Sequence, residues 1–154
     1  MTEGPRENRR DTGRLETEPQ YTSPFTVAGR IKSFRHALAG LFFVLRSQHN
    51  AWVHAAVTVL VIVLAVVLGS ETTPLRTDEW CVLVLAVTIV WVAETLNTGL
   101  EVLADALMPE RHPTVKIAKD VAAGAVLIGS IGAFVVALFL FVPRFVALFG
   151  ALGR

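Results

Sequence analysis

Residues 94–120, ETLNTGLEVLADALMPERHPTVKIAKD, begin as a polar stripe inside an apolar run, and we expect them to end in a charged loop. The stripe consists of four hydrogen-bonding side chains at intervals of 3, 4 and 4: Glu94, Asn97, Glu101 and Asp105. At about 100° per residue, these intervals place all four within about 80° of one helix face. Ionisable groups inside a membrane span are costly and usually functional, so the stripe decides the interpretation if its helix crosses a membrane.

The composition favours a membrane protein. The chain has 154 residues, of which 53% are hydrophobic, and its mean hydropathy is +0.57. This length leaves room for one domain, and the apolar share is too high for an ordinary soluble one. The net charge of +1 says little as a total, because the charged residues gather in the N-terminal third and the central segment.

Three apolar runs are long enough to be transmembrane helices: residues 51–69, 80–103 and 121–142. The first contains no Asp, Glu, Lys or Arg, and as a helix it would extend about 28 Å, close to the hydrocarbon thickness of a bilayer. The second includes Glu94 and Glu101 and should end before Pro109, since proline disfavours helical geometry just ahead of it. We expect Pro143 and Arg144 to close the third.

The N-terminal part of the chain divides into a tail and a helix. Residues 1–26 have almost no large aliphatic side chains, so they can bury little surface and we expect a disordered cytoplasmic tail. Residues 27–46 carry apolar side chains at intervals of 3 and 4, with basic residues mostly on other faces. Such an amphipathic helix either lies in the headgroup layer or packs on a partner, and the adjoining span favours the membrane surface.

The expected fold is therefore an all-α membrane protein with three transmembrane helices and one N-terminal amphipathic surface helix. Residues 27–154 form its membrane domain. Basic residues predict the orientation, because they collect on the cytoplasmic side of a membrane. They lie before the first span and after the second, whereas the loop 70–79 has only Arg76. The N-terminus and residues 101–120 should thus face the cytoplasm, where nucleotides occur, and the C-terminus should lie outside.

Several kinds of soluble-enzyme site are excluded by the sequence. It contains no GxxxxGK[ST] phosphate loop, no Cys/His cluster with zinc spacing and no Gly-x-Ser-x-Gly elbow. Carboxylates, an amide and basic side chains remain at the cytoplasmic edge. Magnesium prefers one or two carboxylates together with substrate phosphates, so this set suits a hard cation and phosphate oxygens.

Phosphoryl transfer needs a metal, a cation on the phosphates and an acceptor for the hydroxyl proton. In such an enzyme Glu101 could hold the metal, and Glu94 could be the base that meets an alcohol from the bilayer. Lys119 and Arg111 could hold phosphates. Two alternatives stay open at this point: the stripe could lock a non-catalytic helical bundle, or it could line an ion or proton pathway. His54 could be a ligand or a relay, but we interpret it as a histidine held by a neighbour at the headgroup boundary.

The sequence resembles one family of membrane enzymes over roughly residues 31–140. The run Glu94-Thr-Leu-Asn97-Thr-Gly-Leu-Glu101-x3-Asp105 is followed by Pro109-Glu110-Arg111-His112-Pro113 and by Lys116-x2-Lys119-Asp120. In residue type and spacing this closely resembles the prokaryotic diacylglycerol kinase family of small membrane kinases, which includes undecaprenol kinases. Residues 33–40 and the run Gln48-x-Asn50-x3-His54 look similar too.

The resemblance implies a homotrimer of three-span protomers in the bacterial inner membrane. It would transfer the γ-phosphate of ATP to a membrane lipid alcohol at the cytoplasmic face, with Mg²⁺ and with no nucleic-acid partner. By position, Glu94 matches the proposed catalytic base, and Glu101 matches the metal-binding glutamate that also meets the nucleotide. Asn97 and Asp105 match polar residues that shape this site. The resemblance places ATP contacts at His36, Gln48, Glu101, Glu110, Arg111, His112, Lys119 and Asp120.

One departure from the family concerns the metal. The family often has a second metal-binding glutamate where this chain has Gln48. A glutamine carbonyl can coordinate magnesium but adds no negative charge, so we expect Glu101 and Gln48 to bind the cation more weakly than two glutamates. The acceptor stays open between diacylglycerol and undecaprenol. The residue types at His112-Pro113 and at residues 122–125 resemble the undecaprenol branch of the family more than the diacylglycerol branch.

Overall fold

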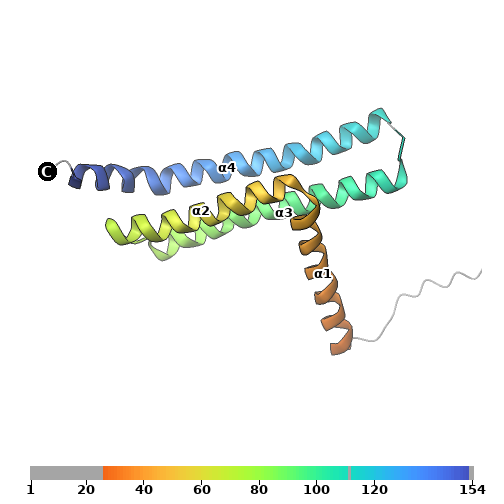
Figure 1. The fold of residues 1–154 in the computed structure, drawn as a ribbon, viewed down its shortest axis with the longest axis horizontal. Helices are drawn as coiled ribbons and strands as arrows, with labels where there is room; N and C mark the ends of the chain where they lie inside the picture. The colour runs from red at the N-terminus through yellow and green to blue at the C-terminus, as the bar shows by residue number, and fades with distance from the viewer. Residues whose placement is uncertain (1–25, 111, 153–154) are drawn as a thin grey trace, which may run out of the picture.

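Four α-helices make up the part of the chain that the computed structural model describes, residues 26–110 and 112–152. Their bounds are Val27–Ser47 for α1, His49–Glu71 for α2, Thr77–Leu107 for α3 and Pro113–Leu152 for α4. Helices α2, α3 and α4 run side by side and alternate in direction, whereas α1 points away from them (Figure 1). The all-helical prediction is confirmed. The predicted tail lies outside the described residues except for Thr26, and Arg111 lies outside them as well.

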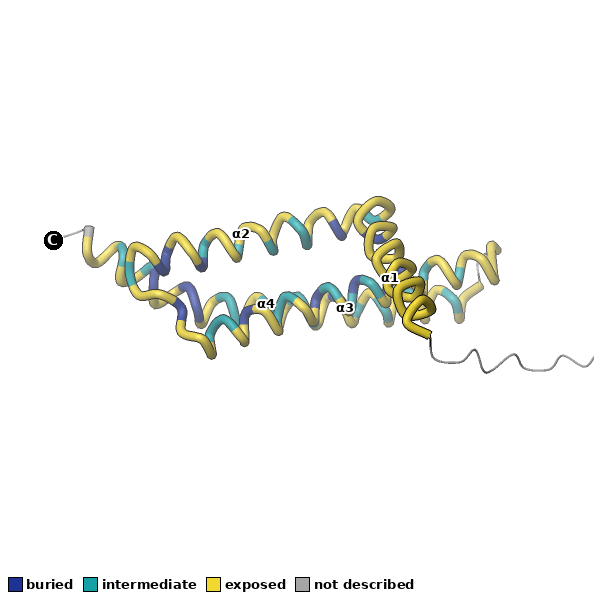
Figure 2. Tube along the Cα trace, turned by 90° about the horizontal axis from the view of Figure 1, so that it is seen from below, coloured by how far each residue is buried: buried dark blue, intermediate teal, exposed yellow. Residues whose placement is uncertain are grey.

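Three of these helices are long and apolar enough to cross a membrane, namely α2, α3 and α4. Most residues on their outer surfaces are exposed, and buried positions follow only the inner faces (Figure 2). A bilayer accepts such apolar exterior surface, and helices satisfy their own backbone hydrogen bonds there. The prediction of three transmembrane candidates is thus confirmed. With 31 residues, α3 extends about 46 Å and exceeds the hydrocarbon layer of about 30 Å.

Helix α1 begins and ends at identifiable residues. The Thr26 hydroxyl accepts a hydrogen bond from the Gly29 backbone N–H at 3.3 Å, which caps the first turn. At the other end, Gln48 alone separates α1 from α2, and its backbone is extended with φ −108° and ψ 122°. This one-residue break turns the chain sharply. Apolar residues of α1 such as Ile31, Phe34 and Leu38 remain exposed, as both the headgroup layer and a packing partner would require.

The start of α4 corrects one prediction. Lys119 and Asp120 were expected in a charged loop, but α4 already begins at Pro113. Proline suits the first helical position, since its missing N–H would have no partner there. His112 caps this turn, with its Nδ1 accepting from the Thr114 N–H at 3.3 Å. Asp105 of α3 and Lys119 of α4 therefore face each other from two helices.

The end of α4 corrects a second prediction. Pro143 and Arg144 were expected to close the third span, but the helix continues to Leu152. Proline removes one hydrogen bond from a helix and normally bends or breaks it. Here Phe145 and Leu148 beyond the proline pack against the apolar core, and this tertiary contact offsets the lost bond.

The core lies at the end of the bundle where α2 connects to α3. Six buried apolar side chains meet there: Ala65, Leu68, Leu75, Leu83, Leu140 and Phe141. Arg144 locks this end, since its guanidinium donates to Glu79 Oε2 at 2.7 Å, to the Thr73 carbonyl at 3.0 Å and to the Leu140 carbonyl at 2.6 Å. Farther along, Gly129 of α4 faces α3, where an added Cβ would lie 3.6 Å from Ile89 Cγ2. Small side chains thus let α3 and α4 approach closely.

We expect Glu79→Gln to lower the free energy of unfolding in detergent micelles by about 1–3 kcal/mol. The substitution leaves the buried Arg144 guanidinium without a charged acceptor, and unsatisfied buried donors cost about this much. A matched control is Asp78→Asn, because Asp78 is 63% exposed in its pair with Arg76 and such pairs contribute about 0–1 kcal/mol. If denaturant titration shows equal losses of unfolding free energy in the two variants, the Arg144–Glu79 pair does not have this stabilising role.

Candidate functional site

The four residues of the polar stripe lie along α3 with increasing exposure. Glu94 and Asn97 are buried, with 1% and 6% of their surface exposed, and Glu101 is half-buried. The side chain of Asp105 is 69% exposed. The stripe therefore connects the interior of the three-helix bundle to the end of the bundle where α3 connects to α4. A ligand at that end and a ligand inside the bundle would both meet α3 polar groups.

The deepest member of the stripe is Glu94. Its Oε2 lies 3.7 Å from His54 Nε2 of α2, within ion-pair range but longer than a hydrogen bond. In the described part of the chain, no hydrogen-bond partner exists for Glu94 Oε2, for Asn97 Oδ1 or for Thr98 Oγ1. Buried polar atoms without partners are costly and often mark functional sites. Of these three residues, Glu94 and Asn97 also line a pocket, so the buried face of α3 is a candidate place for a polar ligand.

A small pocket of about 250 Å³ opens at Glu94. Its walls come from all three spanning helices: Asn50, Val53 and His54 of α2, Glu94 and Asn97 of α3, and Ala123, Val126, Leu127 and Ser130 of α4. Polar side chains thus converge on one point between mostly apolar walls. Such a lining suits a hydroxyl group that is attached to hydrocarbon.

Glu101 connects three segments of the chain. Its Oε2 accepts a hydrogen bond from Gln48 Nε2, and its Oε1 accepts one from Asn97 Nδ2, each at 3.2 Å. Gln48 stands at the break between α1 and α2, so this contact ties the break to the stripe. The structure therefore brings Gln48, Asn97 and Glu101 together. Gln48 lies 53 residues before Glu101 in the sequence, and Asn97 lies 4 residues before it.

The donor set around Glu101 fits a magnesium ion that arrives with phosphate ligands. A carboxylate and an amide oxygen are hard donors, and a half-turn of the Gln48 amide would bring its oxygen to the same point. Within residues 26–110 and 112–152, no three His, Cys, Asp or Glu side chains converge as a metal site. The protein would therefore supply one or two ligands, and phosphate oxygens and water would complete the shell.

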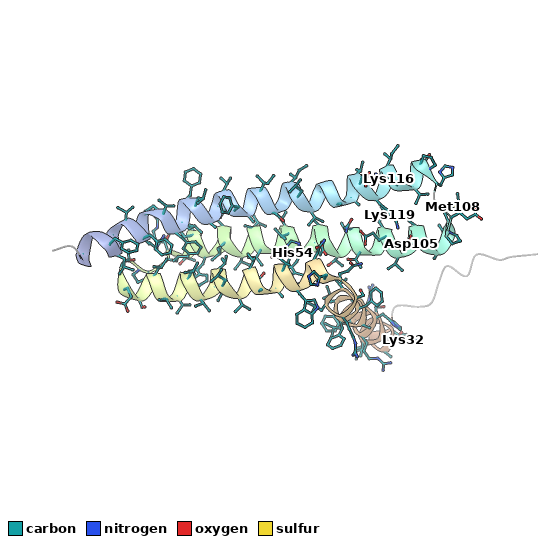
Figure 3. The ribbon with its side chains drawn as sticks, turned by 45° about the horizontal axis from the view of Figure 1, so that its top comes forward. Lys32, His54, Asp105, Met108, Lys116 and Lys119 are labelled. Carbon is teal, nitrogen blue, oxygen red and sulfur yellow. The ribbon has the colours of Figure 1, made fainter. Side chains whose placement is uncertain are left out.

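A larger pocket of about 510 Å³ lies at the α3–α4 end. It is lined by Asp105, Met108, Pro109, Glu110, His112, Pro113, Val115, Lys116 and Lys119. Lys119 of α4 pairs with Asp105 of α3 across it, as Figure 3 shows. Lys116 pairs with Asp120 one turn along α4 at 2.5 Å. Volume and charge suit a polar ligand such as a nucleotide.

Four of the described residues that the sequence predicts for the site line neither pocket: Gln48 and Glu101, which form the cluster described above, and His36 and Asp120. His36 is exposed on α1 and lines neither of them, and Asp120 reaches the larger pocket only through its partner Lys116. Arg111 lies outside the described residues. Conversely, Asn50 and Ser130 line the Glu94 pocket, although the sequence alone predicts no role for either. Ser130 carried a usable signal, since it is the only polar side chain in the apolar run 121–142.

The model of the prokaryotic diacylglycerol kinase family matches residues 35–141 of the chain. The chain belongs to this family. Among its relatives, the undecaprenol kinase of Bacillus subtilis is 32% identical over 113 residues, which is 73% of this chain and 88% of that protein. The diacylglycerol kinase of Synechocystis sp. is 38% identical over 117 residues, 75% of this chain and 64% of that protein. The diacylglycerol kinase of Helicobacter pylori is 31% identical over 126 residues, 77% and 98% of the two chains.

Membership confirms the resemblance found in the sequence. The protein is a membrane lipid kinase of the prokaryotic diacylglycerol kinase family, and it uses ATP. Every described residue of the two pockets and of the Glu101 cluster lies inside the matched range 35–141. The names of the relatives divide between two lipid alcohols, undecaprenol and diacylglycerol.

Proposed function

We propose that this kinase transfers the γ-phosphate of ATP to the hydroxyl of a long-chain membrane lipid alcohol at the cytoplasmic face. The observation that carries the proposal is the gradient of exposure along the α3 stripe. Glu94 is buried beside a pocket within the bundle, whereas Asp105 and Lys119 face a pocket at its end. One helix thus presents polar groups to a hydrocarbon-bound hydroxyl and to a water-soluble nucleotide.

Glu94 is the proposed base. Its carboxylate lies at the pocket of about 250 Å³, whose other walls are largely apolar, so a hydroxyl that enters with hydrocarbon behind it meets this oxygen. A positioned base that removes the hydroxyl proton makes the oxygen a better nucleophile toward phosphorus. Asn97, next along the stripe, lines the same pocket and would orient the hydroxyl through its unpartnered amide oxygen.

The nucleotide is proposed to occupy the α3–α4 pocket. Lys119 and Lys116 would hold phosphates, and Glu110 and His112 line the same pocket. Arg111, Asp120 and His36 are proposed as further nucleotide contacts on the family resemblance. Glu101 and Gln48, between this pocket and Glu94, would hold Mg²⁺, and Asp105 would shape the site by fixing Lys119. A bound magnesium ion would neutralise phosphate charge during transfer.

The acceptor is proposed to be diacylglycerol or undecaprenol, which share a hydroxyl beside long hydrocarbon. An apolar groove of about 380 Å³ runs between α3 and α4 next to Asn97. Val92, Leu96 and Leu100 contribute to its lining, together with the small residues Ala93, Ala122 and Ala125. Such a groove suits either hydrocarbon chain, which supports a lipid acceptor without favouring one lipid.

We infer that the N-terminus faces the cytoplasm and the C-terminus faces the outside of a bacterial inner membrane. Basic residues support this orientation, since Lys32 lies on α1 and Lys116 and Lys119 lie at the α3–α4 end (Figure 3). The opposite end, at the α2–α3 loop, has Arg76 beside Asp78 and Glu79. We further propose the homotrimer that the family resemblance implies.

An acceptor panel tests the function. The full chain in mixed micelles that contain both diacylglycerol and undecaprenol should convert γ-labelled ATP into a labelled phospholipid, and the reaction should require magnesium. Thin-layer separation of the two products identifies the acceptor. Label released only as inorganic phosphate, with neither lipid labelled, would overturn the proposal.

Glu94→Gln should lower kcat by about 100- to 10,000-fold, the usual contribution of a positioned base. The amide keeps the size of the side chain but cannot take the hydroxyl proton. The matched control is Glu71→Gln, which makes the same change at an exposed residue at the C-terminal end of α2. Turnover that survives in Glu94→Gln, in protein with unchanged oligomer size, would remove Glu94 as the base.

Gln48→Glu should lower the magnesium concentration for half-maximal activity by about tenfold, because a second carboxylate adds charge to the ligand set. Without magnesium the new carboxylate should repel Glu101, to which Gln48 now donates a hydrogen bond, so thermal stability should fall and then recover as the metal binds. His49→Glu places the same charge on the adjacent exposed residue. If both variants show the same magnesium dependence, Gln48 does not face the metal.

A further inference from the structure

His54 makes specific contacts near the proposed base, and the proposed function gives this residue no role. It lies near the start of α2, its side chain is 17% exposed, and its Nε2 faces Glu94 Oε2 at 3.7 Å. The imidazole lines the same pocket of about 250 Å³ as Glu94. A side chain that contacts the proposed base and also lines the acceptor pocket can influence the chemistry directly.

The imidazole is held in place by a frame from two helices. Trp91 of α3 meets the His54 ring edge-on, with the ring centroids 6.4 Å apart and the planes at 65°. The Trp91 indole N–H donates to the Thr58 hydroxyl at 3.1 Å, and this hydroxyl donates to the His54 backbone carbonyl at 2.7 Å. Trp91 and Glu94 lie three residues apart on α3, so they share one helix face. The ring therefore approaches both Trp91 and the Glu94 carboxylate.

A purely structural ion pair would look different, and this chain contains one for comparison. Arg144 and Glu79 close to 2.7 Å, and the same guanidinium also bonds two backbone carbonyls. In contrast, His54 and Glu94 stay 3.7 Å apart, and Glu94 Oε2 has no hydrogen bond within the described residues. The looser pair borders a pocket, so a hydroxyl can reach the carboxylate while the imidazole stays beside it.

We propose that His54 is a positioning residue that holds Glu94 toward the acceptor hydroxyl and then takes up the proton that Glu94 removes. This rests on the proposed function, with Glu94 as base. The acceptor oxygen forms a bond to the γ-phosphorus while its proton moves to the Glu94 carboxylate. The bond from the γ-phosphorus to the β–γ bridging oxygen breaks, and its electron pair leaves with ADP. The proton then passes from Glu94 to His54 Nε2, which restores the carboxylate.

The pocket contains no competing ionisable group on the described residues that line it. Besides His54 and Glu94, its lining consists of Asn50, Asn97, Ser130 and apolar side chains. The wall from α4 is uncharged: Ala123, Val126, Leu127 and Ser130. The nearest further carboxylate on α3 is Glu101, about two turns away, and its oxygens are bonded to Gln48 and Asn97. His54 is thus the group placed to receive the proton.

The test uses full-length His54→Gln and His54→Ala in the mixed-micelle assay with saturating ATP and magnesium. Glutamine fills the site but cannot take the proton, so kcat should fall about 10- to 100-fold, while KM for ATP and for the lipid stays within about twofold. Added imidazole should partly restore kcat in His54→Ala. The matched control is His49→Gln, an exposed histidine five residues earlier, which should keep the wild-type kcat.

A second measurement does not depend on turnover. The ring ¹⁵N resonances of His54 in micelles should shift when Glu94 is replaced by glutamine, since the pair is then lost. Unchanged kcat in His54→Gln, or unchanged ring resonances in Glu94→Gln, would overturn the inference. If kcat is unchanged in His54→Gln while the wild type is active and Glu94→Gln is inactive, Glu94 remains the base and only the role of His54 is refuted. Turnover that survives in Glu94→Gln would instead remove the base itself.

Discussion

The burial of Glu94 constrains the rest of the molecule. A carboxylate with 1% of its surface exposed is costly inside an apolar bundle unless other polar groups face it. Side chains from neighbouring helices lower this cost, although none of the described residues forms a hydrogen bond to its Oε2: His54 stands opposite, and Asn50 and Ser130 border the same pocket. Helices α2 and α4 must therefore keep a fixed rotation about α3, because a turned helix would present a valine or leucine to the carboxylate.

The two ends of the bundle solve different problems. At the α2–α3 end, six apolar residues and the Arg144–Glu79 pair leave a closed structure. Toward the α3–α4 end, the polar contacts are longer or more exposed, and two pockets open. Rigid packing at one end can hold the helices while the other end accepts ligands. The apolar core and the candidate site thus occupy separate lengths of the same three helices.

Sequence patterns located the spans and the polar stripe because both depend on local periodicity. They did not reveal that α4 begins at Pro113, although a proline after a capping histidine is a usable local signal. Its continuation past Pro143 depends on contacts with residues far away in sequence, including Glu79. The partner of Glu94 could not be predicted either, since it depends on how α2 is rotated against α3. Periodicity assigns residues to faces, and only packing pairs the faces.

The break at Gln48 determines how the two pockets relate to each other. Helix α2 starts level with Glu101, as the Gln48–Glu101 bond shows, whereas α3 continues to Leu107 and α4 begins at Pro113. The α3–α4 pocket is therefore built by α3, α4 and the segment that connects them, and α1 points away from these helices (Figure 1). The Glu94 pocket has walls from three helices.

In the proposed arrangement, a nucleotide would approach the α3–α4 pocket from water, the acceptor hydroxyl would lie in the Glu94 pocket, and the two would meet near Glu101. Two carboxylates at this junction would repel each other until a cation arrived. Gln48 instead donates a hydrogen bond from its side-chain amide to Glu101 Oε2 at 3.2 Å. This hydrogen bond connects the junction without a cation, and Gln48, the weaker of the two proposed metal ligands, would hold the Glu101 carboxylate in place until magnesium binds.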